Sequence, residues 1–174
     1  MIELKLIITG NMGAGKTTAI AALSEFPPVR TEVPVGAEQV RGDKTTTTVA
    51  LDYGARRLDD GRRLLIFGTP GQRRFDFMCR ILARGAVGVI ILIDHAAENP
   101  SEDLDYYVEL FKDTIADCGA VVGITHVDER PDLPLDAYHA ILGRRSLMLP
   151  VFTVDARRRE HIVTMIEALL AIVH

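Results

Sequence analysis

A glycine-rich loop at residues 10–17 constrains the fold of this chain more than any other segment. It reads Gly-Asn-Met-Gly-Ala-Gly-Lys-Thr and matches G-x-x-x-x-G-K-[ST] at every fixed position. A largely apolar run, residues 4–8, precedes it, and a helix-like run, residues 18–23, follows it, as this motif requires. Such glycines let backbone N–H groups close around a phosphate at the positive end of a helix, where Lys16 adds charge and Thr17 is a ligand for Mg²⁺. The loop therefore predicts binding of a nucleoside phosphate.

The composition is that of one globular domain. A chain of 174 residues can bury a core without disulfides, and 48% hydrophobic and 25% charged residues are ordinary values. The two cysteines, Cys79 and Cys118, have neither zinc-ligand nor C-x-x-C spacing. The net charge of −4 argues against nucleic acid as the main partner. Because no signal peptide, bilayer-spanning run or lipidation motif is evident, we expect a cytoplasmic protein without a direct membrane anchor.

Strand-like and helix-like runs alternate along the chain. Strand patterns occur at 3–9, 47–53, 63–67, 86–94, 120–125 and 148–154, and helical periodicity occurs at 16–25, 74–84, 101–117, 134–143 and 157–172. Several strands are apolar on both faces, which is typical of a parallel sheet covered by helices on both sides. The sequence therefore predicts a single α/β domain, residues 1–174, with three layers and a six-stranded, mostly parallel sheet.

Two regions depart from this alternation. Asp59-Asp60-Gly61 lies between two strand-like runs and predicts a hairpin, which places one antiparallel strand at the edge of the sheet. Residues 26–46 contain three prolines and two glycines and show no periodicity. We predict a long loop there, and loops of that length in compact domains usually have a function.

Four further segments carry chemistry, and three of them follow predicted strands. Residues 68–72 read Gly-Thr-Pro-Gly-Gln, residues 45–48 are four threonines before a strand, residues 123–128 read Gly-Ile-Thr-His-Val-Asp, and residues 153–157 read Thr-Val-Asp-Ala-Arg. Together with the phosphate loop, they resemble the motifs of the Ras-like small GTPases over essentially the whole chain. The Thr-Pro-Gly-Gln variant resembles the bacterial branch of the gliding-motility polarity GTPases and the actinobacterial conservon GTPases. The resemblance implies a three-layer P-loop NTPase fold.

On this resemblance, the first two segments act on phosphate and metal. The Gly71 N–H would bond the γ-phosphate, and Gln72 would orient the attacking water. One threonine of residues 45–48, Thr48 first and Thr47 second, would ligate Mg²⁺ in the GTP state. The family's metal-side aspartate is Gly68 here, which should weaken the surroundings of the metal. The implied catalytic residues are Lys16, Thr48 and Gln72, and the implied Mg²⁺ ligands are Thr17 and Thr48.

The other two segments would recognise the base. The Asp128 carboxylate would accept hydrogen bonds from guanine N1–H and N2–H₂, which adenine does not offer. Thr125 and His126 replace the Asn and Lys of the family motif, and the Ala156 N–H would bond guanine O6. The complete set expected to contact the nucleotide is Asn11, Met12, Gly13, Ala14, Gly15, Lys16, Thr17, Thr18, Gly71, Thr125, His126, Asp128, Asp155, Ala156 and Arg157.

The resemblance implies a molecular switch that binds GTP with Mg²⁺ and hydrolyses it slowly to GDP. A regulatory or effector protein would bind the switch segments, and the related bacterial GTPases suggest a roadblock-fold activating protein. Arg41, Arg73 and Arg74 are candidates to assist hydrolysis, although surface charge is the commoner role of such residues. Two alternatives stay open: a nucleotide-stabilised adaptor with little hydrolysis, because Gly68 removes a carboxylate, and a small P-loop kinase.

Overall fold

The computed structural model describes residues 2–36 and 46–172, and within 32–36 and 46–50 it describes the backbone alone. Its strands are β1 (Glu3–Gly10), β2 (Val29–Gly36), β3 (Thr46–Arg57), β4 (Arg63–Gly68), β5 (Gly88–Asp94), β6 (Ala120–Thr125) and β7 (Val151–Thr153). Its helices are α1 (Lys16–Leu23), α2 (Asp76–Ala83), α3 (Pro100–Leu110), α4 (Lys112–Cys118), α5 (Asp136–Arg144) and α6 (Arg159–Ile172), with short 3₁₀ turns η1 (Arg73–Phe75) and η2 (Val127–Glu129). None of these helices is long and apolar enough to cross a bilayer.

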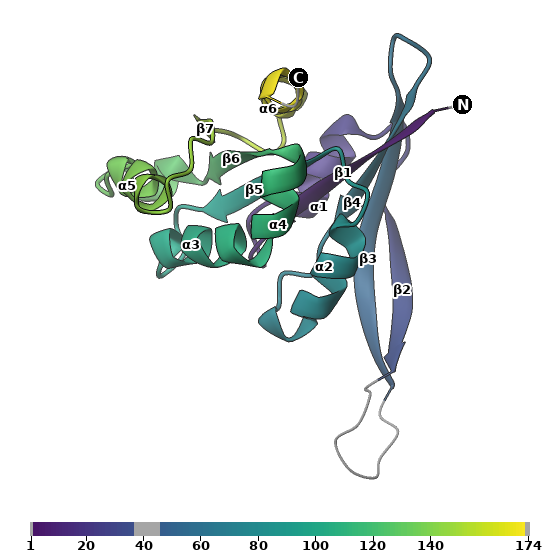
Figure 1. Cartoon of the computed structure of the whole chain (residues 1–174), viewed down its shortest axis with the longest axis horizontal. Helices are drawn as coiled ribbons and strands as arrows, with labels where there is room; N and C mark the ends of the chain where they lie inside the picture. Colours follow the sequence, from purple (N-terminus) through teal and green to yellow (C-terminus); the bar gives the residue numbers. More distant parts are fainter. Residues whose placement is uncertain (1, 37–45, 173–174) are drawn as a thin grey trace.

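The seven described strands form one sheet in the order β2-β3-β4-β1-β5-β6-β7 (Figure 1). Strands β4, β1, β5, β6 and β7 run parallel, and β3 is antiparallel to both of its neighbours. The α/β prediction is confirmed, with one strand more than the six predicted. The hairpin between β3 and β4 turns at Gly61, which has φ +83°.

The additional strand, β2, lies inside the segment that we predicted to be a loop. It pairs along its whole length with β3, so β2 rather than β3 forms the edge of the sheet. Pro34 lies within β2, and an edge strand tolerates proline because one row of its N–H groups needs no partner strand. The prediction of an antiparallel edge strand was therefore wrong in position: the antiparallel strand is second from the edge.

Two hydrophobic clusters hold the helices against the sheet. On one face α1 and α6 pack through Ile20, Ile162 and Met165 onto Leu6 and Ile66. The other face is covered by α2 to α5, through Cys79, Leu104, Phe111, Ile115 and Tyr138, among others. The predicted helix 101–117 is two helices, because the chain leaves helical geometry at Phe111, with φ −105° and ψ 13°.

The parallel strands end together at one edge of the sheet. Because β4, β1, β5 and β6 are adjacent and parallel, the segments that follow them are neighbours in space. These segments are the phosphate loop after β1, residues 69–72 after β4, residues 95–97 after β5 and residues 126–128 after β6. In open α/β sheets this edge is where ligands bind.

Candidate functional site

The phosphate loop turns sharply from β1 into α1. Gly15 caps α1 in the left-handed region, with φ +97°, where a side chain would be strained. The Lys16 Nζ donates hydrogen bonds to the carbonyl oxygens of Gly10, at 2.7 Å, and Asn11, at 2.6 Å. Burial lowers the pKa of Lys16 to about 8, while the negative charge of Asp52 acts in the opposite direction. The loop thus holds a partly buried cation at the N-terminus of a helix, which is a site for an anion.

Two cavities meet at this loop. The first, the Lys16 cavity, has a volume of about 510 Å³ and is lined by phosphate-loop residues, by residues between 69 and 75, and by Arg30 and Asp52. The second, the Asp128 cavity, has a volume of about 600 Å³ and is lined by residues 125–129 and 153–157 with His161. Gly13, Gly15 and Thr18 line both. A ligand with an anionic end and a planar polar end could therefore span the two cavities across the loop.

Most of the predicted residues line these cavities. The Lys16 cavity contains Met12, Lys16, Thr17, Gly71 and Gln72, the Asp128 cavity contains Thr125, His126, Asp128, Asp155, Ala156 and Arg157, and Gly13, Gly15 and Thr18 line both. Asn11 and Ala14 line neither, and their carbonyl groups instead accept hydrogen bonds from Lys16 and Thr125. The structure thus brings most of the predicted residues together around two adjoining cavities, and their contact with a nucleotide stays a prediction.

The Gly71–Gln72 segment lies directly against the phosphate loop. A Cβ at position 71 would be 2.6 Å from the Met12 backbone nitrogen and 3.0 Å from the Lys16 Nζ, so only glycine can approach this closely. The Gln72 Nε2 donates a weak hydrogen bond to the Met12 Sδ at 3.6 Å. The sheet topology thus places the predicted water-orienting amide at the mouth of the Lys16 cavity.

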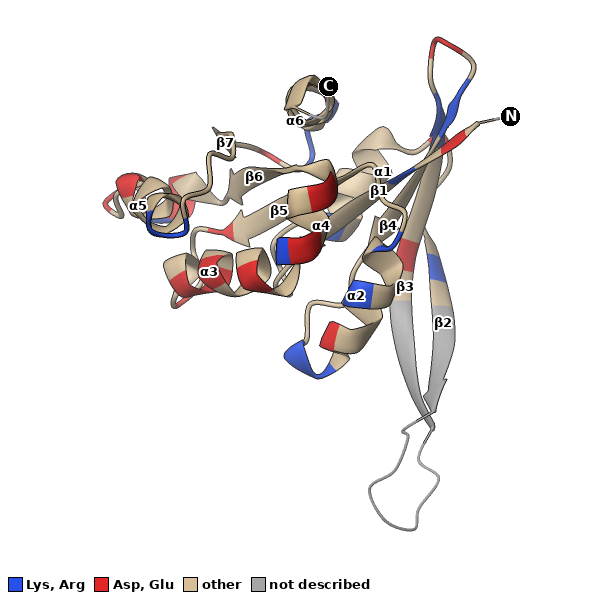
Figure 2. Ribbon diagram, in the orientation of Figure 1, with Lys and Arg blue, Asp and Glu red and all other residues tan. Residues whose placement is uncertain are grey.

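Asp52 is a functional candidate that the sequence did not reveal. The Thr17 hydroxyl donates a hydrogen bond to the Asp52 Oδ2, and the Asp52 carboxylate lines the Lys16 cavity. In the β3–β4 ladder Asp52 is paired with Gly68, and in the β2–β3 ladder it is paired with Arg30. The blue segment of β2 and the red segment of β3 lie side by side in Figure 2. The signal was the strand register, which the sequence alone does not give.

The predicted Mg²⁺ ligands Thr47 and Thr48 lie within β3, where their backbones pair with Val35 and Pro34. Thr48 is four residues from Asp52 along this strand, which corresponds to about 13 Å at the usual rise of a strand. The role of Thr48 in binding Mg²⁺ stays a prediction, and it requires the β2–β3 ladder to rearrange. Thr45 and Arg41 lie outside the described residues.

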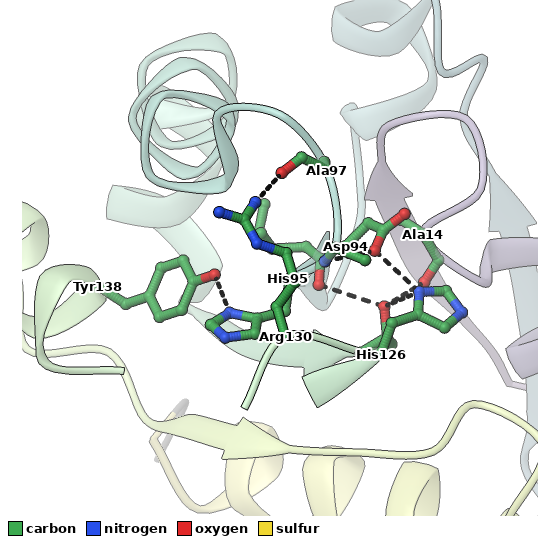
Figure 3. A network of polar contacts seen from close by, with 10 residues as sticks. Ala14, Asp94, His95, Ala97, His126, Arg130 and Tyr138 are labelled. Atoms are coloured by element: carbon green, nitrogen blue, oxygen red, sulfur yellow. Dashed lines mark hydrogen bonds and ion pairs between the residues drawn. The ribbon is translucent and has the colours of Figure 1, made fainter. Parts of the chain in front are cut away.

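A hydrogen-bond network fixes the wall of the Asp128 cavity (Figure 3). The Thr125 hydroxyl donates to the Ala14 and Ile93 carbonyls, at 3.1 and 3.2 Å, and so ties the end of β6 to the phosphate loop. His126 has a left-handed backbone, with φ 54°, and its Nδ1 lies 2.9 Å from the Asp94 Oδ1. Thr125 thus ties the end of β6 to the phosphate loop, and Asp94 restrains the imidazole of His126.

The same network continues away from the cavity. The fully buried His95 places Nδ1 2.7 Å from the Tyr138 hydroxyl on α5, and Arg130 donates to the Ala97 carbonyl at 2.7 Å. Figure 3 shows both contacts on the same side of the loop after β5, opposite the contact of His126 with Asp94. They anchor the loop after β5 to α5 and to the segment that follows Asp128.

The loop after β7 closes the far side of the Asp128 cavity. Ala156 is buried and lies close to Gly15, where an added Cβ would be 2.9 Å from the Ala156 Cβ. The Asp155 N–H donates to the His161 Nδ1 at 3.0 Å. The Arg157 guanidinium contacts the Asp155 carboxylate at 2.7 Å and holds the pKa of that group well below its usual range. The sequence did not reveal His161, because its role depends on helix α6 packing beside this loop.

The arginines that follow Gln72 have different positions. Arg74 lines the Lys16 cavity, whereas the Arg73 guanidinium lies 4.2 Å from the centre of the Tyr106 ring. Arg30, from β2, also lines the cavity. A cation could therefore reach a bound phosphate from Arg30 or Arg74 without a partner protein.

Comparisons with known proteins agree with this geometry. Residues 8–129 match the model of a family described as "Conserved hypothetical ATP binding protein". The G domain of the FeoB iron transporter of T. maritima is similar in structure, with a TM-score of 0.65 and 17% sequence identity over 97% of this chain and 98% of that one. The fold is therefore that of a P-loop GTPase domain.

Curated relatives match only part of the chain. An uncharacterized protein of Methanocaldococcus jannaschii is 30% identical over 58% of this chain and 57% of its own length. The Ras-related protein Rab-13 of Canis lupus familiaris is 27% identical over 63% and 49%, and the GTP-binding protein ypt2 of Schizosaccharomyces pombe is 31% identical over 52% and 40%. The chain spans about half the length of these relatives.

Proposed function

The chain belongs to the protein family described as conserved hypothetical ATP-binding proteins, and we propose that it is a GTP-binding switch that hydrolyses GTP to GDP. One observation carries the proposal: the Lys16 cavity and the Asp128 cavity join at the phosphate loop. The first offers a cation and amide donors to phosphates, and the second offers a carboxylate to a base. The names of the Ras-related and GTP-binding relatives support the same function.

The choice of guanine rests on Asp128. A carboxylate is an acceptor only, so it pairs with a base edge that presents two donors, as guanine N1–H and N2–H₂ do. Adenine presents a donor and an acceptor on the corresponding edge and would leave one carboxylate oxygen facing a lone pair. The family description mentions ATP, and this makes base identity the first point to test.

Different residues of the chain act on the phosphates and on the attacking water. Lys16 places its charge against the β- and γ-phosphates, and the Gly71 N–H bonds the γ-phosphate. Gln72 orients the attacking water once its amide leaves the Sδ of Met12, to which it donates a weak hydrogen bond. Arg30 and Arg74, on the wall of the same cavity, are placed to neutralise charge that develops on the phosphates.

The residues present fit a bound Mg²⁺. The Thr17 hydroxyl and the Asp52 carboxylate are hard oxygen donors on the wall of the Lys16 cavity, which is the donor type that Mg²⁺ prefers. When bound, Mg²⁺ neutralises charge that develops on the β- and γ-phosphates. Thr17 would hold the ion directly, and Thr48 would join only after a rearrangement of β3.

The partner is a regulatory or effector protein that binds the switch segments, residues 36–48 and 69–80. The Thr-Pro-Gly-Gln segment supports a place in the bacterial branch of polarity and conservon GTPases, for which a roadblock-fold activating protein is the corresponding partner. Co-purification of this chain with such a protein, dependent on GTP analogue rather than GDP, tests that part.

A second function is that of a nucleotide-stabilised adaptor with little hydrolysis. The contact of Gln72 with Met12 favours it, because a Gln72 amide held by Met12 does not orient an attacking water. Identification of the nucleotide released from purified protein tests both functions, because GDP indicates hydrolysis and retained GTP indicates an adaptor. Multiple-turnover assays then compare the wild type with Gln72→Leu. A switch loses at least about tenfold in rate, whereas an adaptor shows the same low rate in both proteins.

A further inference from the structure

Side chains at positions 52 and 68 would need the same space beside the phosphate loop. They are directly paired on neighbouring antiparallel strands, so side chains at both positions project from the same face of the sheet. A Cβ at position 68 would lie 3.2 Å from the Asp52 Cβ and 2.9 Å from the Ile20 Cδ1. The side chains of Asp52 and Ile20 therefore already fill the space that a side chain at position 68 would need.

We propose that Asp52 supplies, from β3, the carboxylate that fixes the Mg²⁺ ligand Thr17, a task for which position 68 has no side chain. This assignment rests on the proposed function, because it assumes a nucleotide held with Mg²⁺. It makes Asp52 a positioning residue, which acts on the metal through the hydroxyl of Thr17.

The hydrogen bond between Thr17 and Asp52 has the direction that this role requires. The hydroxyl donates its proton to the carboxylate, which leaves the oxygen lone pairs of Thr17 for a cation. A carboxylate that accepts this proton also makes the hydroxyl oxygen a better donor to a metal. The carboxylate itself lines the Lys16 cavity, together with Lys16 and Thr17.

An ion pair with Arg30 does not account for Asp52. The shortest contact between them is 3.8 Å, and the Arg30 side chain is 69% exposed, whereas that of Asp52 is 16% exposed. Exposed pairs of this kind contribute little to stability. The Oδ2 of the carboxylate instead accepts the hydrogen bond of Thr17, and this contact accounts for Asp52 better than the distant guanidinium does.

The test is the Mg²⁺ dependence of nucleotide release. N-methylanthraniloyl-GDP is loaded, and its dissociation rate is followed by fluorescence from EDTA to 10 mM Mg²⁺. The readout is the Mg²⁺ concentration at half-maximal slowing, so any effect of Asp52 on Lys16 that is independent of metal cancels. In Asp52→Asn, which keeps the shape of the side chain, this concentration should rise about 10- to 100-fold.

An exchange variant tests whether a carboxylate at position 68 can replace the carboxylate at position 52. In Asp52→Gly/Gly68→Asp the carboxylate moves to β4, and the loss of the Asp52 Cβ removes one of the two close contacts at position 68. The other contact is with the end of the Ile20 side chain, which can rotate. This variant should recover most of the wild-type Mg²⁺ dependence, and Gly68→Asp alone should not improve on the wild type.

A matched control removes a carboxylate that lies away from the Lys16 cavity. Asp60→Asn removes an exposed carboxylate of the β3–β4 hairpin, which pairs with Arg62, and it should keep the wild-type Mg²⁺ midpoint. Mn²⁺ titration of the GDP complex, followed by electron paramagnetic resonance, measures the metal affinity directly, including for variants that release nucleotide too fast to follow.

The outcomes distinguish this inference from the proposed function. An unchanged Mg²⁺ midpoint and Mn²⁺ affinity in Asp52→Asn, or a loss as large in Asp60→Asn, would overturn the role of Asp52. Failure of the wild type to bind the labelled GDP would instead contradict the guanine assignment. In that event the same comparison with labelled ADP still tests Asp52, because Thr17 and Asp52 contact the phosphate end of either nucleotide.

Discussion

Nucleotide binding should weaken as the pH rises above 8, because Lys16 loses its charge in the empty site. Burial lowers the pKa of Lys16 to about 8, and the nearby Asp52 only partly offsets this effect. Bound phosphates bring negative charge to the Nζ and raise its pKa again, so binding takes up a proton once the pH exceeds 8. The affinity is therefore full below this pKa and falls as the pH rises through it.

The expected size of the effect follows from this pKa. If the pKa in the complex returns to its ordinary value of about 10.4, the dissociation constant should rise about fourfold between pH 7 and pH 8.5. Isothermal titration calorimetry with GDP and Mg²⁺, in buffers of different ionisation enthalpy, measures the affinity and the proton uptake together. Stopping at pH 8.5 keeps the guanine N1–H protonated.

Two variants serve as controls for this titration. Lys16→Arg keeps its charge over the whole range, so whatever affinity it retains should be independent of pH. Lys5 also has a pKa lowered by burial, but its Nζ donates to the Arg84 carbonyl at 3.0 Å, and it lines neither cavity. Lys5→Met should therefore retain the fourfold change. A flat affinity and no proton uptake at pH 8.5 in the wild type would show that Lys16 does not change its protonation on binding.

Two further substitutions have defined outcomes. Gly71→Ala places a Cβ 2.6 Å from the Met12 nitrogen and 2.9 Å from the Asn11 carbonyl carbon, so the segment must move off the loop. Single-turnover GTP hydrolysis should fall at least about tenfold while circular dichroism stays unchanged, and a wild-type rate would show that the close approach is unnecessary. Tyr138→Phe leaves the buried His95 without a partner on Nδ1, in addition to its unpaired Nε2, and should lower the free energy of unfolding in urea by about 1–3 kcal/mol. A change below about 0.5 kcal/mol would contradict that account.

Local patterns predicted most of the fold. The parallel strands β5 and β6 are nearly continuous apolar runs, β1 is largely apolar, and the hairpin at Gly61 has the expected turn residues, so each could be identified from a few adjacent residues. Strand β2 could not, because it contains Pro34 and depends on pairing with β3, which is a contact between distant residues. The break at Phe111 was hidden by an apolar periodicity that continues from α3 into α4.

The candidate site likewise has parts that local motifs predicted and parts that depend on contacts between distant residues. The phosphate loop and the loop with Asp128 are contiguous motifs, and the sequence placed both correctly beside the cavities. Asp52 was missed because its importance arises from cross-strand pairing with Gly68, and no local pattern gives that register. Thr48 shows the opposite case, since a local motif predicted it as a ligand but its backbone is paired with Pro34 within β3.

Competition between GDP and ADP tests whether this site selects guanine through Asp128, as we propose. Two hydrogen bonds to a carboxylate predict that GDP binds at least about tenfold more tightly than ADP at the same Mg²⁺ concentration. In Asp128→Ala the preference should disappear, while the affinity for ADP stays within about threefold. Equal binding of the two nucleotides by the wild-type protein, or tighter binding of ADP, would contradict the account.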